Sequence, residues 1–274
     1  MSAPNAVQWS QPEREGLLGI ALTAAIGAAA LIRGRSAEAS SLDWREKSPA
    51  DFVSDVDTAA EETIRAVIAR ECPDALVIAE EGSPDAMLGE GIAFIVDPLD
   101  GTTNFLHGYP EYAVSIAAAE NGSIVAGVVI NVATGERFTA RAGAGAWRNG
   151  ARIRVSGITT PARALIGTGF PFKSLEQLDV YQRQFAAIMR ATSGIRRAGA
   201  AALDLADVAC GRFDAFWELA LMPWDFAAGM LLVGEAGGIV TDLTGAEPSL
   251  VPSGLVAANP AMHRWLIDTL RGAA

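Results

Sequence analysis

The residues best suited to chemistry follow one apolar run, within residues 92–105, IAFIVDPLDGTTNF. Five apolar residues predict a buried strand that stops at Asp97-Pro98, because proline has no N–H and holds the preceding residue extended. The chain then turns, so that Asp97, Asp100 and the carbonyl oxygen of Leu99 can converge on one point. These hard oxygen ligands suit Mg²⁺ or Mn²⁺, whereas the stretch has none of the sulfur or imidazole that zinc prefers.

The same stretch continues into a segment suited to hold an anion. Gly101 lets the backbone approach a ligand closely, and Thr102 with Thr103 can begin a helix whose first amides point outward. Metal ligands next to a phosphate cradle indicate metal-assisted phosphoryl chemistry. The alternative is a tight turn followed by an ordinary helix N-terminus, and the turn alone does not decide between the two.

Two further acidic positions follow predicted strands. Glu80-Glu81 comes after a short strand over residues 74–79, and Glu218 ends a strand over residues 213–218. Adjacent carboxylates repel each other unless cations or hydrogen-bond donors offset the repulsion. Taken alone, an acidic pair is more typical of a solvated surface.

Two aspartates stand at the start of predicted helices. Asp57 precedes an amphipathic helix over residues 58–70, and Asp225 opens a helix over residues 226–236. Each would be explained equally well as a capping or first-turn acid, which stabilises a helix N-terminus without any chemical role.

The elements that must position these residues alternate between helix and strand patterns. Antiparallel strands are predicted over residues 112–120, 123–132, 136–141 and 145–148, separated by Asn-Gly and Thr-Gly turns. A helix is predicted over residues 178–191. Such a pattern by itself supports only a mixed α and β fold.

One apolar segment, residues 16–32, is long enough to raise the question of a membrane span. It follows Glu13, Arg14 and Glu15 rather than a positive region, and it is rich in alanine and glycine. We therefore predict a buried first helix over residues 12–35 rather than a membrane or signal segment.

Composition restricts the classes of protein. The 274 residues are 50% hydrophobic, enough for a large core, and we expect one catalytic domain over residues 1–274. The net charge of −11, without any block of like charges, argues against a nucleic-acid partner or an anionic membrane surface. Cys72 and Cys210 are too few for a disulfide framework, so we expect a reducing cytoplasm.

The string DPLDGTTNF resembles the signature of the inositol monophosphatase family, whose members are Mg²⁺-dependent, lithium-sensitive phosphatases. The acidic pair at Glu80 and the Trp224-Asp225 motif occur in the order that this family has, and the resemblance spans about residues 14 to 271. The strings GFPFK, RRAGAAALDLA and FWE resemble the bacterial inositol-1-monophosphatase subgroup. The resemblance implies an α+β fold, a layered αβαβα sandwich of the inositol monophosphatase and fructose-1,6-bisphosphatase type, and a homodimer.

The resemblance also assigns roles to residues. Two Mg²⁺ ions, with a third and weaker one by analogy and Mn²⁺ as a substitute, would be held by Glu80, Asp97, Leu99, Asp100 and Asp225. The attacking water would be activated by Glu80, Asp57 and Thr102. The phosphate ester would be bound by Leu99, Asp100, Gly101, Thr102, Gly199, Ala200, Ala201, Glu218 and Asp225.

The substrate stays open at this stage. The subgroup resemblance favours myo-inositol 1-phosphate, with histidinol phosphate as the alternative, because the same metal site serves several small phosphate esters. No basic pocket for a second phosphate is evident in the sequence, which disfavours bisphosphates. A hypothesis of another class is a protein-binding regulatory module with incidental phosphatase activity.

Overall fold

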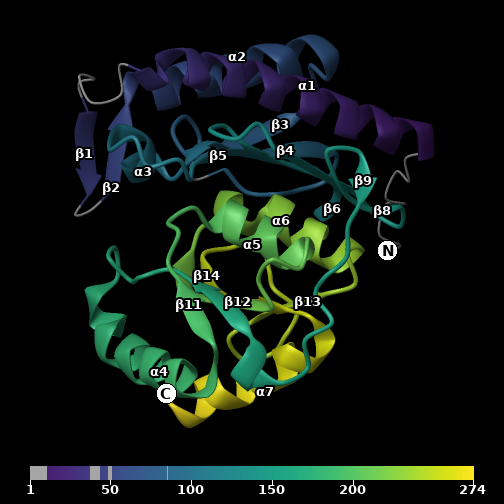
Figure 1. Cartoon of the computed structure of the whole chain (residues 1–274). Helices are drawn as coiled ribbons and strands as arrows, with labels where there is room; N and C mark the ends of the chain where they lie inside the picture. Colours follow the sequence, from purple (N-terminus) through teal and green to yellow (C-terminus); the bar gives the residue numbers. More distant parts are fainter. Residues whose placement is uncertain (1–10, 38–43, 49–50, 85) are drawn as a thin grey trace, which may run out of the picture.

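The structure of the chain is a computed structural model that describes residues 11–37, 44–48, 51–84 and 86–274. Helices and sheets alternate in the order αβαβα, as predicted (Figure 1). The outer helices on the first sheet are α1 (Gln11–Arg35) and α2 (Asp55–Glu71). The central helices are α5 (Ala201–Ala209) and α6 (Pro223–Glu235), and the outer helices on the second sheet are α4 (Leu178–Ala191) and α7 (Pro260–Gly272).

The first sheet has seven strands, and its first two are parallel while the others pair antiparallel. In spatial order these strands are β3 (Leu76–Ala79), β4 (Ile92–Asp100), β5 (Ala113–Glu120), β6 (Ser123–Asn131), β7 (Arg137–Arg141), β8 (Gly145–Arg148) and β9 (Ala151–Arg152). The predicted antiparallel strands over residues 112–148 are therefore confirmed as β5 to β8.

The second sheet has five strands, in which parallel and antiparallel pairs are mixed. In spatial order they are β11 (Gly194–Arg196), β10 (Leu165–Thr168), β12 (Ala215–Leu221), β14 (Ser253–Ala258) and β13 (Ile239–Asp242). The remaining elements are the hairpin of β1 (Trp44–Ser48) and β2 (Asp51–Ser54), the short helix α3 (Thr102–Leu106), and 3₁₀ turns at Pro161–Arg163 and Leu175–Gln177.

Helices cover both faces of the first sheet, and this explains why its strands are apolar without alternation. Successive side chains of a strand point to opposite faces. Phe94 and Val96 accordingly pack in the cluster with α1 and α2, whereas Ile95 packs in the cluster with α5 and α6. A strand buried on both faces can expose polar groups only at its ends, which is where β4 carries its aspartates.

The structure corrects the predicted end of β4. The strand does not stop at Asp97-Pro98 but runs to Asp100, with Asp97 paired to Ser115 and Asp100 paired to Ala113. The register shifts between the two aspartates, because Pro98 has no N–H to donate and the ladder must skip it. The bulge gives both carboxylates a rigid sheet as their support instead of a free turn.

Strand β12 was also predicted too short. It begins at Ala215 and continues to Leu221, so Glu218 lies inside the strand and not at its end. The register shifts between Glu218 and Leu221, where β12 pairs with β14. The irregular ladder lets a glutamate occupy an otherwise apolar strand.

Helix α1 confirms the prediction of a first helix. Its segment Gly16–Arg35 is long and apolar enough to cross a membrane by length and composition alone. In the fold, however, Ala21, Ala24, Ala25 and Ala28 are fully buried and pack with residues of α2 and the first sheet. Small side chains let the helices and the sheet approach closely, which explains the alanine-rich composition.

We expect the buried face of α1 to reject larger side chains. Ala25→Leu should lower the free energy of unfolding by about 1–3 kcal/mol, because extra methylenes have no space in a packed core. Ala30 is exposed on the same helix, so Ala30→Leu should change it by no more than about 0.5 kcal/mol. Urea unfolding of both variants measures the difference, and equal effects would contradict the packing described for α1.

Candidate active site

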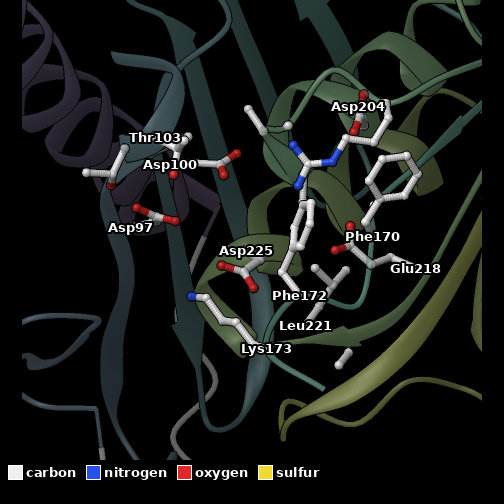
Figure 2. A pocket seen from close by; sticks show the side chains of 18 of the residues that line it. Asp97, Asp100, Thr103, Phe170, Phe172, Lys173, Asp204, Glu218, Leu221 and Asp225 are labelled. Atoms are coloured by element: carbon white, nitrogen blue, oxygen red, sulfur yellow. The ribbon is translucent and has the colours of Figure 1, made fainter. Parts of the chain in front are cut away.

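The predicted site residues meet around one cavity of about 350 Å³. Figure 2 shows Asp97, Asp100 and Thr103 on one side of this cavity and Phe170 and Glu218 on the other, with Asp225 between. The sides come from β4 with α3 and from the second sheet with the loop after β10, so the site joins the two sheets. The cavity is lined by the predicted residues Glu80, Asp97, Leu99, Asp100, Gly101, Thr102, Gly199, Ala200, Ala201, Glu218 and Asp225.

Asp57 does not line the cavity but reaches it through Thr102. The hydroxyl Oγ1 of Thr102 lies 2.8 Å from Asp57 Oδ1 and 3.0 Å from the carbonyl oxygen of Leu99, and it can donate to either. Asp57 Oδ2 accepts hydrogen bonds from the N–H and the hydroxyl of Ser54. Asp57 is therefore a capping residue of α2, which was the alternative interpretation of its position in the sequence, and it is also the hydrogen-bond partner of the Thr102 hydroxyl at the cavity.

Burial raises the pKa of the Asp57 carboxyl, and its hydrogen bonds with Ser54 and Thr102 oppose the rise.

Gly101 makes the close approach of backbone segments possible at this point. Its φ is +88°, and a Cβ there would lie 2.9 Å from the carbonyl oxygen of Glu111. The side chain of Asn104 donates to this carbonyl and to the carbonyl of Ala198. Asn104 thus ties α3 to the segment that carries Gly199, and the two predicted substrate-binding segments face the same cavity.

The aspartates form a strongly acidic group inside the protein. Burial raises the pKa of Asp97 well above its ordinary range, and the charges of Glu80, Asp100 and Asp225 raise it further. Burial and the charge of Asp225 raise the pKa of Asp100 in the same way. Like charges at such positions need cations or protons to offset them.

Backbone amides hold one oxygen of each aspartate. Leu99 N–H donates to Asp97 Oδ1 at 3.0 Å, Ala202 N–H to Asp100 Oδ2 at 2.8 Å, and Met222 N–H to Asp225 Oδ2 at 2.7 Å. Each aspartate has its second carboxylate oxygen in addition, and all three residues line the cavity.

Within the described part of the chain, no three acidic, histidine or cysteine side chains are gathered closely enough to form a ready-made metal cluster. The carboxylates that line the cavity nevertheless offer hard oxygens and excess negative charge, which fit Mg²⁺ or Mn²⁺.

Glu218 occupies a position that depends on Gly169, the residue directly after the neighbouring strand β10. A Cβ on Gly169 would lie 2.0 Å from Glu218 Cδ, so only glycine leaves room for the carboxyl group. Burial and the charge of Asp225 raise the pKa of Glu218 to about 8. The sequence analysis did not single out Gly169; its signal is a glycine that ends a strand directly before an aromatic loop.

Asp204 is a cavity residue that the role assignments missed. It is buried, lines the cavity, and its Oδ1 has no hydrogen-bond partner among the described residues. Burial raises its pKa well above the ordinary range, and the charges of Glu218 and Asp100 raise it further. The available signal was an aspartate within the apolar helix AALDLADVA, of whose two aspartates only Asp204 is buried.

The chain resembles known proteins over nearly its whole length. The sequence model of the inositol monophosphatase family matches residues 13–273. The chain is 46% identical over 259 residues to Nus factor SuhB of Pseudomonas aeruginosa, covering 93% of this chain and 96% of that protein. It is 41% identical over 260 residues to an inositol-1-monophosphatase of Mesorhizobium japonicum, covering 94% and 97%.

Solved structures agree as well. Extragenic suppressor protein suhB of Bartonella henselae superposes with a TM-score of 0.88 at 41% identity, over 93% of this chain and 98% of that one. The inositol monophosphatase of Anabaena superposes with a TM-score of 0.85 at 35% identity, over 95% and 97%.

We expect Asp204 to make stability depend on pH in the metal-free protein. An acid whose pKa is raised by folding binds more protons when folded, so its contribution to stability falls as pH rises above its unfolded pKa of about 3.9. Asp204→Asn removes this loss. The free energy of unfolding of the wild type should fall relative to the variant by up to about 1.4 kcal/mol per pH unit within the titration range. Urea unfolding between pH 4 and 8 measures it, and parallel curves would contradict the burial of the acid.

Proposed function

The chain belongs to the inositol monophosphatase family and is a metal-dependent phosphatase, and from this premise we propose that it hydrolyses myo-inositol 1-phosphate to myo-inositol and phosphate. The observation that carries the proposal is the contact of Thr102 with Asp57 beside the buried aspartates. It places a hydroxyl that can relay a proton next to carboxylates that suit divalent cations. We propose that residues 1–274 act as one catalytic domain.

The metal ligands of the proposal are Glu80, Asp97, the carbonyl of Leu99, Asp100 and Asp225. They would hold two Mg²⁺ ions, or Mn²⁺ as a substitute, with a third and weaker site near Glu80. When bound, the metal ions supply a water of lowered pKa and neutralise the charge that develops on the leaving oxygen.

The chain itself moves the proton of the attacking water. Thr102 Oγ1 accepts this proton while it gives its own proton to Asp57 Oδ1, 2.8 Å away. We assign Glu80, which also lines the cavity, to the activation of the same water. The water oxygen forms a bond to phosphorus, the bond between phosphorus and the inositol oxygen breaks, and the inositol oxygen takes up a proton from solvent water.

Binding of the ester follows from the walls of the cavity. The N–H groups of Gly101 and Thr102 donate hydrogen bonds to phosphate oxygens, and Leu99, Asp100 and Asp225 line the cavity around the phosphate. Gly199, Ala200 and Ala201 supply a small, close wall for the alcohol portion. Glu218 hydrogen-bonds hydroxyl groups of the alcohol, which suits a polyol.

Phosphate release from a panel of esters tests the substrate. The panel holds myo-inositol 1-phosphate, histidinol phosphate, fructose 1,6-bisphosphate and adenosine 3′,5′-bisphosphate, each with Mg²⁺ and with EDTA. We expect Mg²⁺-dependent turnover that is fastest on inositol phosphate. Preference for histidinol phosphate would change the assigned substrate but not the assigned metal ligands. If the folded, metal-bound protein released no phosphate from any of the four esters, the proposal would be contradicted.

A second candidate function is that of a protein-binding regulatory module, and the names of two relatives favour it. The relatives from Pseudomonas aeruginosa and Escherichia coli are both called Nus factor SuhB. A stoichiometric partner that binds the Asp97→Asn variant as well as the wild type would support this function. We further propose that the protein is a cytoplasmic homodimer and that lithium inhibits it. Analytical sedimentation would measure the oligomeric state, and phosphate release in the presence of Li⁺ would measure the inhibition.

We expect Asp97→Asn to remove nearly all turnover while the protein stays folded. The variant keeps the size of the side chain and an acceptor for Leu99 N–H, but it loses the charge that neighbouring metal ions require. Steady-state phosphate release and circular dichroism test the expectation. Turnover close to that of the wild type by folded Asp97→Asn protein would be incompatible with the proposed metal ligands.

We expect Glu218→Gln and Gly169→Ala to act mainly on KM. The first replaces a carboxyl oxygen that can accept hydrogen bonds from the alcohol's hydroxyl groups with an amide nitrogen, and the second displaces the carboxyl group because a Cβ at position 169 overlaps it. Loss of a hydrogen bond worth about 0.5–1.5 kcal/mol raises KM by about two- to tenfold, with a smaller change in kcat. Kinetics on myo-inositol 1-phosphate measure both. If kcat fell while KM stayed constant, Glu218 would act in the chemical step instead.

A further inference from the structure

Arg197 makes cation–π contacts with two aromatic rings, Phe170 and Phe172, at the wall of the cavity. The guanidinium carbon Cζ of Arg197 lies 5.4 Å from the ring centre of Phe170 and 5.2 Å from that of Phe172. The two rings meet edge to face at 5.8 Å. All three residues line the site cavity, so the cation belongs to it and not to a remote surface. Cation–π contacts hold the guanidinium while its N–H groups keep their capacity to donate.

The aromatic support is anchored in the core of the second sheet. Phe170 packs edge to face on Tyr181 at 5.6 Å, and Tyr181 stacks on the fully buried Trp217 at 5.9 Å. Phe170 and Phe172 are themselves 37% and 48% exposed. Phe170 therefore contacts the core through Tyr181, and both Phe170 and Phe172 contact the guanidinium of Arg197. These contacts hold the guanidinium at the cavity wall.

The position of Arg197 relative to the substrate walls is fixed by two further observations. Its Nη1 lies where a Cβ on Gly199 would come within 2.6 Å of it, and Gly199 is a proposed wall of the alcohol site. Its charge lowers the pKa of Glu218, as does that of Lys173, against the stronger effect of burial. Arg197 is therefore close to both residues that we assign to the alcohol portion of the ester.

Arg197 also differs from other arginines in its partners. Arg65 and Arg212 form ion pairs with carboxylates at 2.7 Å and 2.6 Å. Arg197 forms no ion pair with any carboxylate in the described ranges of the chain. A cation without a carboxylate partner, in a protein of net charge −11, is suited to receive an anion from a ligand.

We propose that Arg197 forms a distal subsite for a second phosphate group, so that the enzyme acts more efficiently on a polyol bisphosphate than on the corresponding monophosphate. The inference rests on the proposed function, in which the aspartates receive the phosphate to be cleaved. A planar guanidinium matches phosphate through two parallel hydrogen bonds. The subsite revises the sequence-based expectation, because residues 170–173 and Arg197 are brought together only by the fold.

The test compares two substrates that share one ring, myo-inositol 1-phosphate and myo-inositol 1,4-bisphosphate. The ratio of kcat/KM for the bisphosphate to that for the monophosphate is measured with Mg²⁺ for the wild type and for Arg197→Gln. Arg196→Gln is the matched control, since Arg196 is the adjacent arginine, lies outside the cavity lining and donates to the carbonyl of Ile195. We expect Arg197→Gln to lower the ratio at least tenfold through KM, and Arg196→Gln to keep it within twofold.

Binding without turnover gives a second readout. On an Asp57→Asn background, which removes the proton acceptor of Thr102, calorimetric titration with the bisphosphate should show at least tenfold weaker binding when Arg197 is also replaced by glutamine. The monophosphate should lose much less affinity. These titrations measure the subsite even if hydrolysis is slow.

The outcomes separate the two proposals. If Arg197→Gln weakens both substrates equally, Arg197 acts on the cleaved phosphate or on Glu218, and the distal subsite is wrong. If the folded, metal-bound wild type hydrolyses neither substrate, the proposed function fails, and the calorimetric comparison alone decides whether Arg197 selects the second phosphate. A ratio that falls in both variants would show a general charge effect and would also overturn the inference.

Discussion

Repulsion among buried carboxylates is the constraint on which the rest of this structure depends. Asp97 and Asp100 stand on either side of the register shift of β4, with two residues between them, and Glu80 and Asp225 add their charges from other elements. Such a group costs stability in a metal-free protein and is relieved by divalent cations. The backbone amides that hold one oxygen of each aspartate keep the group in place, so the fold maintains a set of carboxylates whose repulsion cations or protons must offset.

The layered architecture explains how the chain can support this arrangement. The first sheet, covered on both faces, supplies Asp97 and Asp100 on one side of the cavity, and the second sheet with its aromatic loop supplies the other side (Figure 2). Asn104 joins the two by hydrogen bonds to backbone carbonyls on both. In the function that we propose, the first side would bind the metal ions, and Gly169, Glu218 and Arg197 on the other would determine which alcohol fits.

Sequence reasoning recovered the parts of the fold that local patterns determine. Apolar runs with Asn-Gly turns predicted β5 to β8, and DPLDGTTNF with its family resemblance predicted the layers and the residues that line the cavity. It misplaced the end of β4 because local rules treat Pro98 as a stop, whereas the pairing with β5 continues around it. It missed the contact of Gly169 with Glu218 and the stacking of Arg197, since both depend on residues distant in the chain.

Calorimetric titration of metal-free protein with Mg²⁺ tests the central claim most directly. The raised pKa values of the aspartates mean that binding must displace protons, so the observed heat should depend on the ionisation enthalpy of the buffer. The account predicts binding to the wild type with proton release, its loss in Asp97→Asn, and its retention in Asp204→Asn, whose side chain lines the same cavity without serving as a ligand. Equal binding by the wild type and Asp97→Asn, or no binding by either, would contradict the account.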